Sequence, residues 1–394
     1  MTGAGVYYDD RAGVLKDFAY FTSHVRGDVF GGEIFAVQFD DDDVIDNPTA
    51  LNAEASIFDN TADYNDLTID LDASATTPNP KLWVVGDNNA RGAVVRNIAL
   101  STFDGLPANM NNPTTADYQQ SAQTLGESLN EYHMPILGPS GNSISIPLDY
   151  TGTGGTTRNE NSQLWVVAGG TSYGGLVVMD KDDDSRLLTR MDVHNAKHFD
   201  MGVDDLGLSG LWGAFLWGDG NFTNGESNLR IFNTSTGPFS YKDYLSSVTL
   251  PATPAANQFA APVAFGDVTF EGKNAIDVDG EFIYMAMGSD GVKKVLASSG
   301  TVVDFYAGPT VYGGNGLANG LVVDNGFVYV AWGASGLVIL DLDLDIVGQY
   351  NGIGSCNYVA VAQHGNAVGA DDILFAGFGT GGIVMFKKVD QVNP

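Results

Sequence analysis

The chain has 394 residues, 44% of them hydrophobic, which is the composition of a globular protein with a large core. Its 48 acidic and 18 basic side chains give a formal net charge of −30. Because binding to phosphate groups requires Lys and Arg, this charge excludes nucleic acid and anionic membrane as main partners. No run of about 18 apolar residues occurs, so the sequence predicts no membrane-spanning helix.

One phrase recurs along the chain and predicts its architecture. It consists of an apolar run with aromatics, a glycine-rich turn and a second apolar run, which often ends in aspartate. Such runs are typical of strands, and the glycines permit the positive φ angles of a tight hairpin. In chain order, the copies cover residues 20–40, 81–95, 163–180, 211–232, 281–296, 327–343 and 372–386.

A short strand with its own pattern precedes most of these hairpins. It begins at an asparagine, and in five of six copies apolar residues stand two and four places later, which predicts one buried face. In the exceptional copy, Lys197 takes the first of these places and only Phe199 fits. The asparagines are Asn65, Asn142, Asn195, Asn274, Asn319 and Asn357.

Together these strands predict an all-β, single-domain β-propeller that spans residues 1–394. Each unit has strand, turn, strand, hairpin and strand, and commonly a fourth strand, such as residues 302–305 and 346–350. Seven units predict seven blades of mostly four antiparallel strands. Six or eight blades are the alternatives, because the first unit lacks a clear inner strand. We expect residues 5–8 to supply the missing fourth strand of the last blade and so to close the ring.

Inner strands that begin at one end of the channel would place the six asparagines around its mouth, where propellers commonly bind ligands. Ligand binding by these residues is therefore one interpretation. The favoured alternative is that they cap the same turn in each repeat.

Two long insertions interrupt the repeats, at about 101–141 and 233–273, and the first contains a predicted short helix near 116–129. Loops of this length on a compact domain either cover a face or bind a partner. The sequence leaves both readings open.

Clustered aspartates suggest a calcium site. Asp180, Asp182 and Asp184 alternate in the chain, which suits oxygen ligation of a hard cation, although the glycine and distal glutamate of an EF-hand loop are missing. The run at residues 40–43 is a second candidate, and a solvated turn is the alternative for both. Further aspartates at 341, 343 and 345 alternate with leucine and are expected on the outer face of a strand.

The sequence indicates no catalytic residue. A Gly-x-Ser-x-Gly elbow, a P-loop and paired cysteines are all missing. His194 and His198 flank the start of a predicted strand, where four residues span about 13 Å, so a shared metal is not expected. Cys356 is the only cysteine, which excludes an intramolecular disulfide and suggests a small buried side chain.

Residues 328–350, VYVAWGASGLVILDLDLDIVGQY, resemble the LVIVD repeat of bacterial β-propellers, with the namesake motif at 337–341 and further matches at 176–180 and 383–386. The resemblance covers about two thirds of the chain. It implies a secreted or surface-anchored bacterial protein whose leader has been removed.

We therefore expect an extracellular or cell-surface module that binds or scaffolds a protein or glycan partner without catalysis. The alternative is a hydrolase or lyase at the channel mouth that is assisted by calcium. A third hypothesis is a structural role as a subunit of a surface assembly.

Overall fold

The computed structural model describes twenty-two segments of the chain. They are residues 2–9, 16–26, 29–39, 53–59, 62–70, 81–88, 92–100, 140–146, 150–151, 157–158, 163–169, 175–180, 187–192, 196–202, 212–218, 227–233, 263–264, 275–309, 316–352, 354–362, 373–379 and 382–387.

These segments form seven antiparallel sheets of three or four strands and one two-stranded ribbon. The first sheet holds β1 (Gly3–Asp9), β2 (Lys16–Arg26), β3 (Val29–Phe39) and β4 (Ala53–Asp59); the second holds β5 (Ala62–Asp70), β6 (Lys81–Asn88) and β7 (Gly92–Ala99). The third holds β8 (Ser140–Ser145), β11 (Gln163–Gly169), β12 (Gly175–Asp180) and β13 (Leu187–Asp192), and the ribbon holds β9 (Tyr150–Thr151) and β10 (Thr157–Arg158). The fourth holds β14 (Ala196–Gly202), β15 (Trp212–Gly218), β16 (Ser227–Asn233) and β17 (Val263–Ala264). The fifth holds β18 (Ala275–Asp279), β19 (Phe282–Ala286), β20 (Val292–Leu296) and β21 (Thr301–Tyr306). The sixth holds β22 (Gly320–Asp324), β23 (Phe327–Ala331), β24 (Leu337–Asp341) and β25 (Ile346–Tyr350), and the seventh holds β26 (Cys356–Ala362), β27 (Ile373–Phe378) and β28 (Gly382–Lys387).

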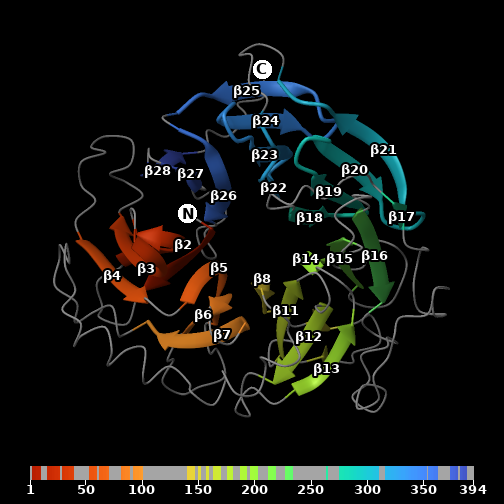
Figure 1. The fold of residues 1–394 in the computed structure, drawn as a ribbon. Helices are drawn as coiled ribbons and strands as arrows, with labels where there is room; N and C mark the ends of the chain where they lie inside the picture. Colours follow the sequence, from red (N-terminus) through yellow and green to blue (C-terminus); the bar gives the residue numbers. More distant parts are fainter. Residues whose placement is uncertain are drawn as a thin grey trace.

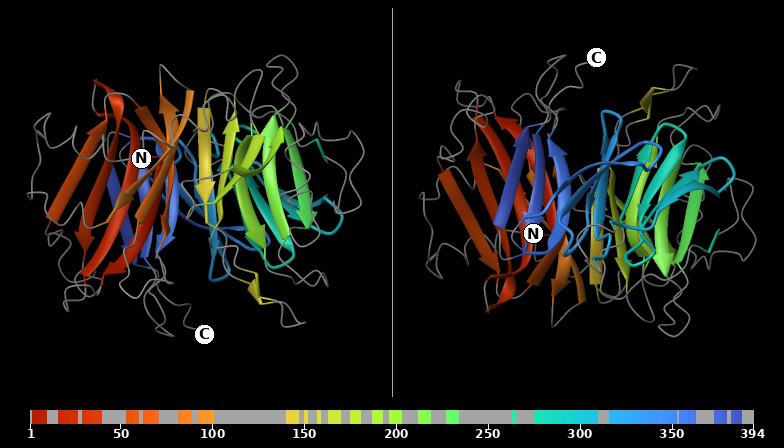
Figure 2. Two further views of the ribbon diagram at one scale, coloured as in Figure 1. Left: turned by 90° about the horizontal axis from the view of Figure 1, so that it is seen from below. Right: turned by 90° about the horizontal axis from the view of Figure 1, so that it is seen from above.

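The seven sheets stand in chain order around a common centre (Figure 1). The innermost strands β1, β5, β8, β14, β18, β22 and β26 each contact the next, and β26 also contacts β1. Seen from the side, the sheets are packed face to face around the axis (Figure 2). The predicted all-β class and antiparallel hairpins are thus confirmed.

The core lies between successive sheets, because each sheet has two apolar faces to bury. Tyr20 and Ile34 of the first sheet pack with Leu67 of the second in one cluster of buried side chains. The rings of Trp165 and Phe199 stack with centroids 4.8 Å apart and join the third sheet to the fourth. Such aromatic pairs each contribute about 0.5–1.5 kcal/mol beyond their buried area.

The expected closure by residues 5–8 is wrong. These residues belong to β1, which pairs with β2 as the innermost strand of the first sheet, so the first unit does have an inner strand. In the described residues the seventh sheet has three strands. The two ends of the ring meet through side chains instead, where Ala19, Phe21 and Phe375 form a buried cluster.

The aspartates at 341, 343 and 345 do not line a strand face, so that expectation is also wrong. Only Asp341 is in a strand, as the last residue of β24, and β25 begins at Ile346. Asp341 Oδ1 accepts hydrogen bonds from the backbone N–H groups of Asp343 (3.0 Å) and Asp345 (2.9 Å). Leu344 has a φ of 59° and is buried within the turn. A carboxylate that caps backbone groups and a buried leucine therefore produce a turn in a sequence that alternates like a strand.

The predicted outer strands are confirmed as β21 and β25. Each contains a β-bulge, which leaves Val303 and Val347 without a direct cross-strand partner. The predicted helix near 116–129 lies outside the described residues. Of the two insertions, only the start of β8, the last residue of β16 and the short β17, which pairs with β16, are described. Within the described part of the chain, no helix is long and apolar enough to cross a membrane.

Candidate functional site

A β-bulge recurs on the innermost strands and aligns the repeats. On four of these strands the pairing register skips one residue, namely Asn65 in β5, Asn142 in β8, Lys197 in β14 and Asn357 in β26. In the fourth sheet, Lys197 thus occupies the place that asparagine occupies elsewhere. The repeat aligned on Asn195 is shifted by two residues, which explains why its apolar pattern fitted poorly. Asn195 and Asn274 lie outside the described residues.

The asparagine amides connect successive sheets. Asn65 Nδ2 donates to the Gly141 carbonyl of β8 at 2.8 Å, and Asn319 Nδ2 donates to the Cys356 carbonyl of β26 at 3.3 Å. Thr2 Oγ1 makes the equivalent bond from the first sheet to the Tyr64 carbonyl of the second, at 2.6 Å. Asn65 Nδ2 also lies 3.4 Å from Asp87 Oδ1 in its own sheet. Ligand binding by the six asparagines stays a prediction.

A second set of polar side chains, which we call the inner polar ring, follows on the same strands. Asp66 Oδ2 accepts from the Ile144 N–H at 3.1 Å, and His198 Nδ1 accepts from the Ile276 N–H at 3.4 Å. Asp200, two residues after His198, accepts the Val278 N–H through Oδ2 at 2.7 Å. In β18, Asp277 Oδ2 accepts the Val323 N–H at 2.5 Å. Every one of these bonds joins an innermost strand to the next innermost strand.

Asp200 and Asp277 form a carboxyl pair within this ring. Burial is the largest cause that raises the pKa of Asp277 well above its ordinary value of 3.8, and the charge and hydrogen bond of Asp200 raise it further. Hydrogen bonds from backbone N–H groups oppose the rise. Two carboxyl groups in such contact favour sharing one proton. Acid–base chemistry is the activity that this pair could support.

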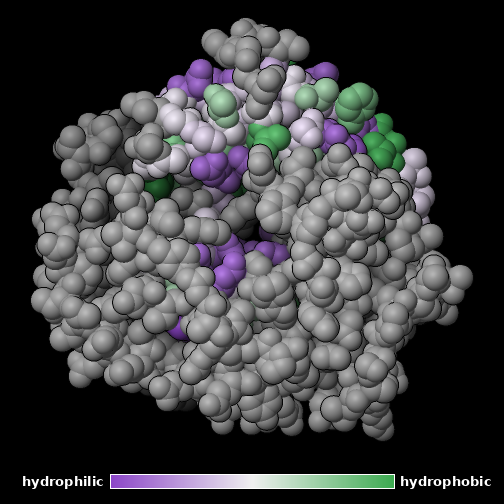
Figure 3. Space-filling view, in the orientation of Figure 1, coloured by the Kyte–Doolittle hydropathy of each residue, from purple (hydrophilic) through white to green (hydrophobic). Residues whose placement is uncertain are grey.

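The charges of the inner polar ring also act on Tyr358 of β26. Burial raises the pKa of its phenol, and the charges of Asp66 and Asp277 raise it further, while a hydrogen bond from the Ala4 backbone lowers it. Asp66 and Asp277 belong to the second and fifth sheets. Hydrophilic residues border the central hollow of the molecule (Figure 3).

Sequence reasoning missed the inner polar ring. The sequence does carry a signal for it. Polar residues stand one or three places after the bulge, as Asp66 does after Asn65 and as His198 and Asp200 do after Lys197. The predicted distance between His194 and His198 is not tested, because His194 lies outside the described residues.

The predicted calcium ligands lie almost wholly outside the described residues. Asp180 is the last residue of β12, whereas residues 182, 184 and 40–43 are not described. Among the residues that are described, no group of three or more His, Cys, Asp or Glu side chains is placed to hold a metal ion. The calcium hypothesis stays a prediction.

Cys356 is buried, as predicted. Burial raises the pKa of its thiol to about 12, so the side chain is a neutral thiol at neutral pH. A neutral buried thiol is a poor nucleophile, and the residue serves as a small apolar group.

The second candidate surface is on the outside of the fifth and sixth sheets. Their outermost strands, β21 and β25, expose large hydrophobic side chains, which we call the apolar rim. It consists of Val302, Val303, Phe305, Ile346, Val347 and Tyr350. Phe305 is 63% exposed. Hydrophobic residues are visible at the edge of the molecule over β21 (Figure 3).

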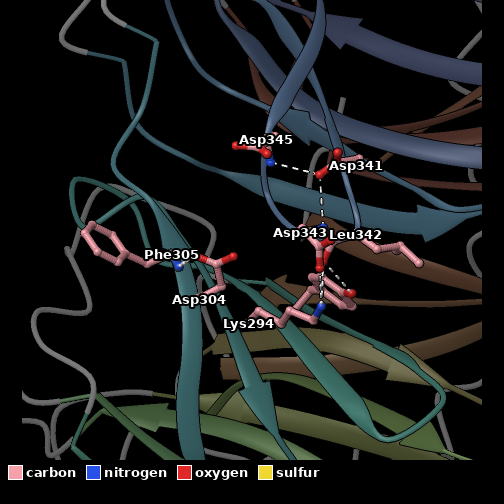
Figure 4. A network of polar contacts seen from close by, with 8 residues as sticks. Lys294, Asp304, Phe305, Asp341, Leu342, Asp343 and Asp345 are labelled. Atoms are coloured by element: carbon pink, nitrogen blue, oxygen red, sulfur yellow. Dashed lines mark hydrogen bonds and ion pairs between the residues drawn. The ribbon is translucent and has the colours of Figure 1, made fainter.

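Lys294 of β20 fixes these two sheets to each other (Figure 4). Its side chain is buried and lies 4.4 Å from the ring centroid of Phe282. Lys294 Nζ donates to the Leu342 carbonyl at 2.7 Å and lies 3.4 Å from Asp343 Oδ1, in the turn between β24 and β25. The Tyr284 hydroxyl donates to the same carbonyl at 3.2 Å. These contacts connect the fifth sheet to the turn that precedes β25 in the sixth sheet.

The sequence matches no protein-family model and none of the curated proteins. Among solved structures, the chain is similar to BBS1N, crystallised in complex with ARL6DN, with 11% identity, a TM-score of 0.51, and coverage of 98% of this chain and 92% of that one. It is also similar to the WD40 β-propeller domain of Doa1, with 9% identity, a TM-score of 0.50, and coverage of 99% and 93%. At this identity the likenesses support a β-propeller fold and carry no function.

Proposed function

We propose that this protein is a seven-bladed β-propeller that binds or scaffolds a protein partner without catalysis. The blade count is supported by seven sheets whose innermost strands contact each other in a cycle. The observation that carries the function is the apolar rim. Large hydrophobic side chains that are exposed on two neighbouring, rigidly connected strands are typical of a protein-binding surface.

The inner polar ring supports the same proposal. Asp66, His198, Asp200 and Asp277 each accept a hydrogen bond from a backbone N–H of the next sheet. Such bonds satisfy backbone groups that would otherwise be buried without a partner, and this is a structural task. The BBS1N structure was solved in complex with ARL6DN, and a propeller crystallised in such a complex is a precedent for the binding role proposed here.

The alternative is a hydrolase or lyase in the channel, and the carboxyl pair of Asp200 and Asp277 is the observation that favours it. An enzyme of this kind would lose its activity in Asp277→Asn while the variant stayed folded. The calcium that would assist it is testable separately, because a cation that binds only the folded state raises the melting temperature. A calcium-dependent rise that is lost in Asp180→Asn would place the cation at that loop.

On the resemblance to LVIVD-repeat proteins alone, we also propose that the protein works outside a bacterial cell, where a glycan is the second class of partner. Subunit contacts in a surface assembly would use the same apolar rim.

The experiment for the protein-binding function is affinity capture from the producing cells, followed by cross-linking. The wild type is compared with Phe305→Ser/Ile346→Ser and with the control Ser298→Ala at an exposed serine. We expect one stoichiometric partner for the wild type and the control, and loss of that partner in the double variant. Equal capture by all three proteins would place the binding surface elsewhere.

A further inference from the structure

Titratable side chains hold the boundary between the innermost strands of the fourth and fifth sheets. His198 Nδ1 accepts the Ile276 N–H at 3.4 Å, and Asp200 Oδ2 accepts the Val278 N–H at 2.7 Å. Between the sixth and seventh sheets, by contrast, the backbone groups of Gly333 and Cys356 bond each other and do not titrate. The two bonds between β14 and β18 therefore depend on the protonation state of their acceptors.

The bond to His198 requires a neutral imidazole. A ring nitrogen accepts a hydrogen bond only when it carries no proton, so the single proton of this ring is on Nε2. A second proton would turn Nδ1 into a donor that faces the Ile276 N–H, and the bond would be lost. Histidine ordinarily changes its charge between pH 5 and 8. The bond is thus present above the pH at which His198 gains this proton and absent below it.

The bond to Asp200 requires a proton on the carboxyl pair. The Val278 N–H also donates to Asp277 Oδ1 at 2.9 Å, so oxygen atoms of both carboxyl groups lie within hydrogen-bond reach of one nitrogen. Two ionised carboxylates around a single donor repel each other, and a shared proton removes the repulsion. The pKa of Asp277, which burial raises first and Asp200 raises further, agrees with this geometry. Loss of the proton in alkali weakens the bond between Asp200 and Val278.

The neighbouring strands bring no described cation that would replace this proton. Among the described side chains of β14, β15, β18, β19 and β22, none is a Lys or Arg. The other described titratable groups on or near these strands are Tyr284, Asp279, Asp324, Tyr358 and Asp66. Phenols are uncharged at neutral pH and further carboxylates only add negative charge, so none of these groups neutralises a second ionised carboxylate in the pair.

We propose that the boundary between β14 and β18 is a pH-sensitive joint, closed when His198 is neutral and the pair of Asp200 and Asp277 holds a proton. Acid opens it at Ile276 through the imidazole, and alkali opens it at Val278 through the carboxyl pair. The apolar cluster that contains Ala214, Leu229 and Ile276 keeps the two sheets packed, so the opening is local to the channel wall.

Hydrogen exchange of the intact protein tests the joint amide by amide. Mass spectrometry with residue-level fragmentation gives the protection of the Ile276 and Val278 N–H groups from about pH 5 to about pH 9, corrected for the intrinsic effect of pH. The Cys356 N–H, which donates to the Gly333 carbonyl, is the reference. We expect protection to fall at Ile276 in acid and at Val278 in alkali, each by about two- to tenfold, the effect of one lost hydrogen bond. The reference should not change.

Variants assign each loss to its group. In His198→Asn an amide oxygen takes the place of Nδ1 and cannot titrate, so the loss in acid should disappear while the loss in alkali remains. In Asp277→Asn the pair can no longer carry two charges, so only the loss in acid should remain. The control Asp279→Asn changes an exposed residue of the same strand and should keep both losses.

The wild type alone decides the question if a variant does not fold. The nitrogen-15 spectrum of its imidazoles should show the His198 proton on Nε2 at neutral pH, and a proton on Nδ1 would refute the joint. Equal pH profiles at Ile276, Val278 and the Cys356 reference would mean general unfolding and would also refute it. A loss in acid that persists in His198→Asn, or a loss in alkali that persists in Asp277→Asn, would overturn the assignment to these side chains.

Discussion

The rings of Phe21 and Phe375 meet edge to face with their centroids 5.5 Å apart, and they join the first sheet to the last. Both rings are fully buried. The strands that carry them, β2 and β27, are almost a whole chain length apart in sequence. Among the described residues, closure of the ring thus depends on packed side chains between two sheets, and no sheet combines strands from both ends of the chain.

Replacing one of these rings tests the closure. Phe375→Ala should destabilise the protein by about 3–5 kcal/mol, because it removes a fully buried aromatic side chain and leaves a cavity. Phe305→Ala is the matched control, since it makes the same change at an exposed position. We expect a clear loss in urea-melt midpoint for the first variant and little change for the second. Similar midpoints for both would contradict closure through Phe375.

Removal of residues 1–10 should lower the melting temperature by several degrees or more. This truncation deletes β1, so β2 loses one of its two pairing partners and β5 and β26 lose a neighbouring strand. It also deletes Thr2 and its bond to the Tyr64 carbonyl. An unchanged melting temperature in a calorimeter would show that β1 has no part in the stability of the ring.

The carboxyl pair predicts a pH-dependent effect of Asp277→Asn. The pKa of Asp277 is raised by burial and by Asp200, so folding favours its protonated form. Stability from this group is therefore complete below its ordinary pKa of 3.8 and is lost as the pH rises through the folded-state pKa. An amide cannot ionise, and its oxygen can still accept the Val323 N–H. Its nitrogen can donate to Asp200, but it takes the place of Oδ1, so the bond from the Val278 N–H is lost.

We accordingly expect Asp277→Asn to melt at a higher temperature than the wild type at pH 8, with a difference that shrinks toward pH 4. The control Asp279→Asn removes the same charge from an exposed residue of the same strand. A variant that is less stable than the wild type at pH 8 would contradict the raised pKa of Asp277.

Lys294 and its neighbour Lys293 offer a matched pair for the connection between the fifth and sixth sheets. Lys294→Met removes a buried charged donor to the Leu342 carbonyl and should cost about 1.5–3 kcal/mol. Lys293 is half-buried and pairs with the more exposed Asp290 at 3.5 Å, and Lys293→Met should cost less than about 1 kcal/mol. Chemical denaturation measures both. Equal losses would mean that the connection through Lys294 does not stabilise the sheets.

The hairpins were predictable from sequence, because apolar runs around glycine encode them locally. β23 and β24 follow the repeated phrase closely, and Gly333 and Gly336 in the turn between them have φ angles of 47° and 85°. A strand at residues 5–8 was predicted, but its place as the innermost strand of the first sheet was not, because it has no starting asparagine and is separated from the hairpin pattern. Its role depends on contacts with β5 and β26, which are remote in sequence.

The two other errors have local physical causes. The turn at Asp341 is fixed by one side-chain oxygen that accepts two backbone N–H groups, and alternation of leucine and aspartate does not reveal such a cap. In the fourth sheet, Lys197 stands at the bulge where asparagine was expected, so the repeat was aligned two residues out of place. The inner polar ring became visible only when the sheets were placed side by side.

Site-specific photo-cross-linking in the producing cells tests the central claim most directly. A photoreactive amino acid is placed at Phe305, at Val347 or at the exposed control position Ser298. The proposed function predicts one discrete cross-linked protein from positions 305 and 347 and none from 298. Labelling that is equal at all three positions, or absent from both rim positions, would contradict a protein-binding rim.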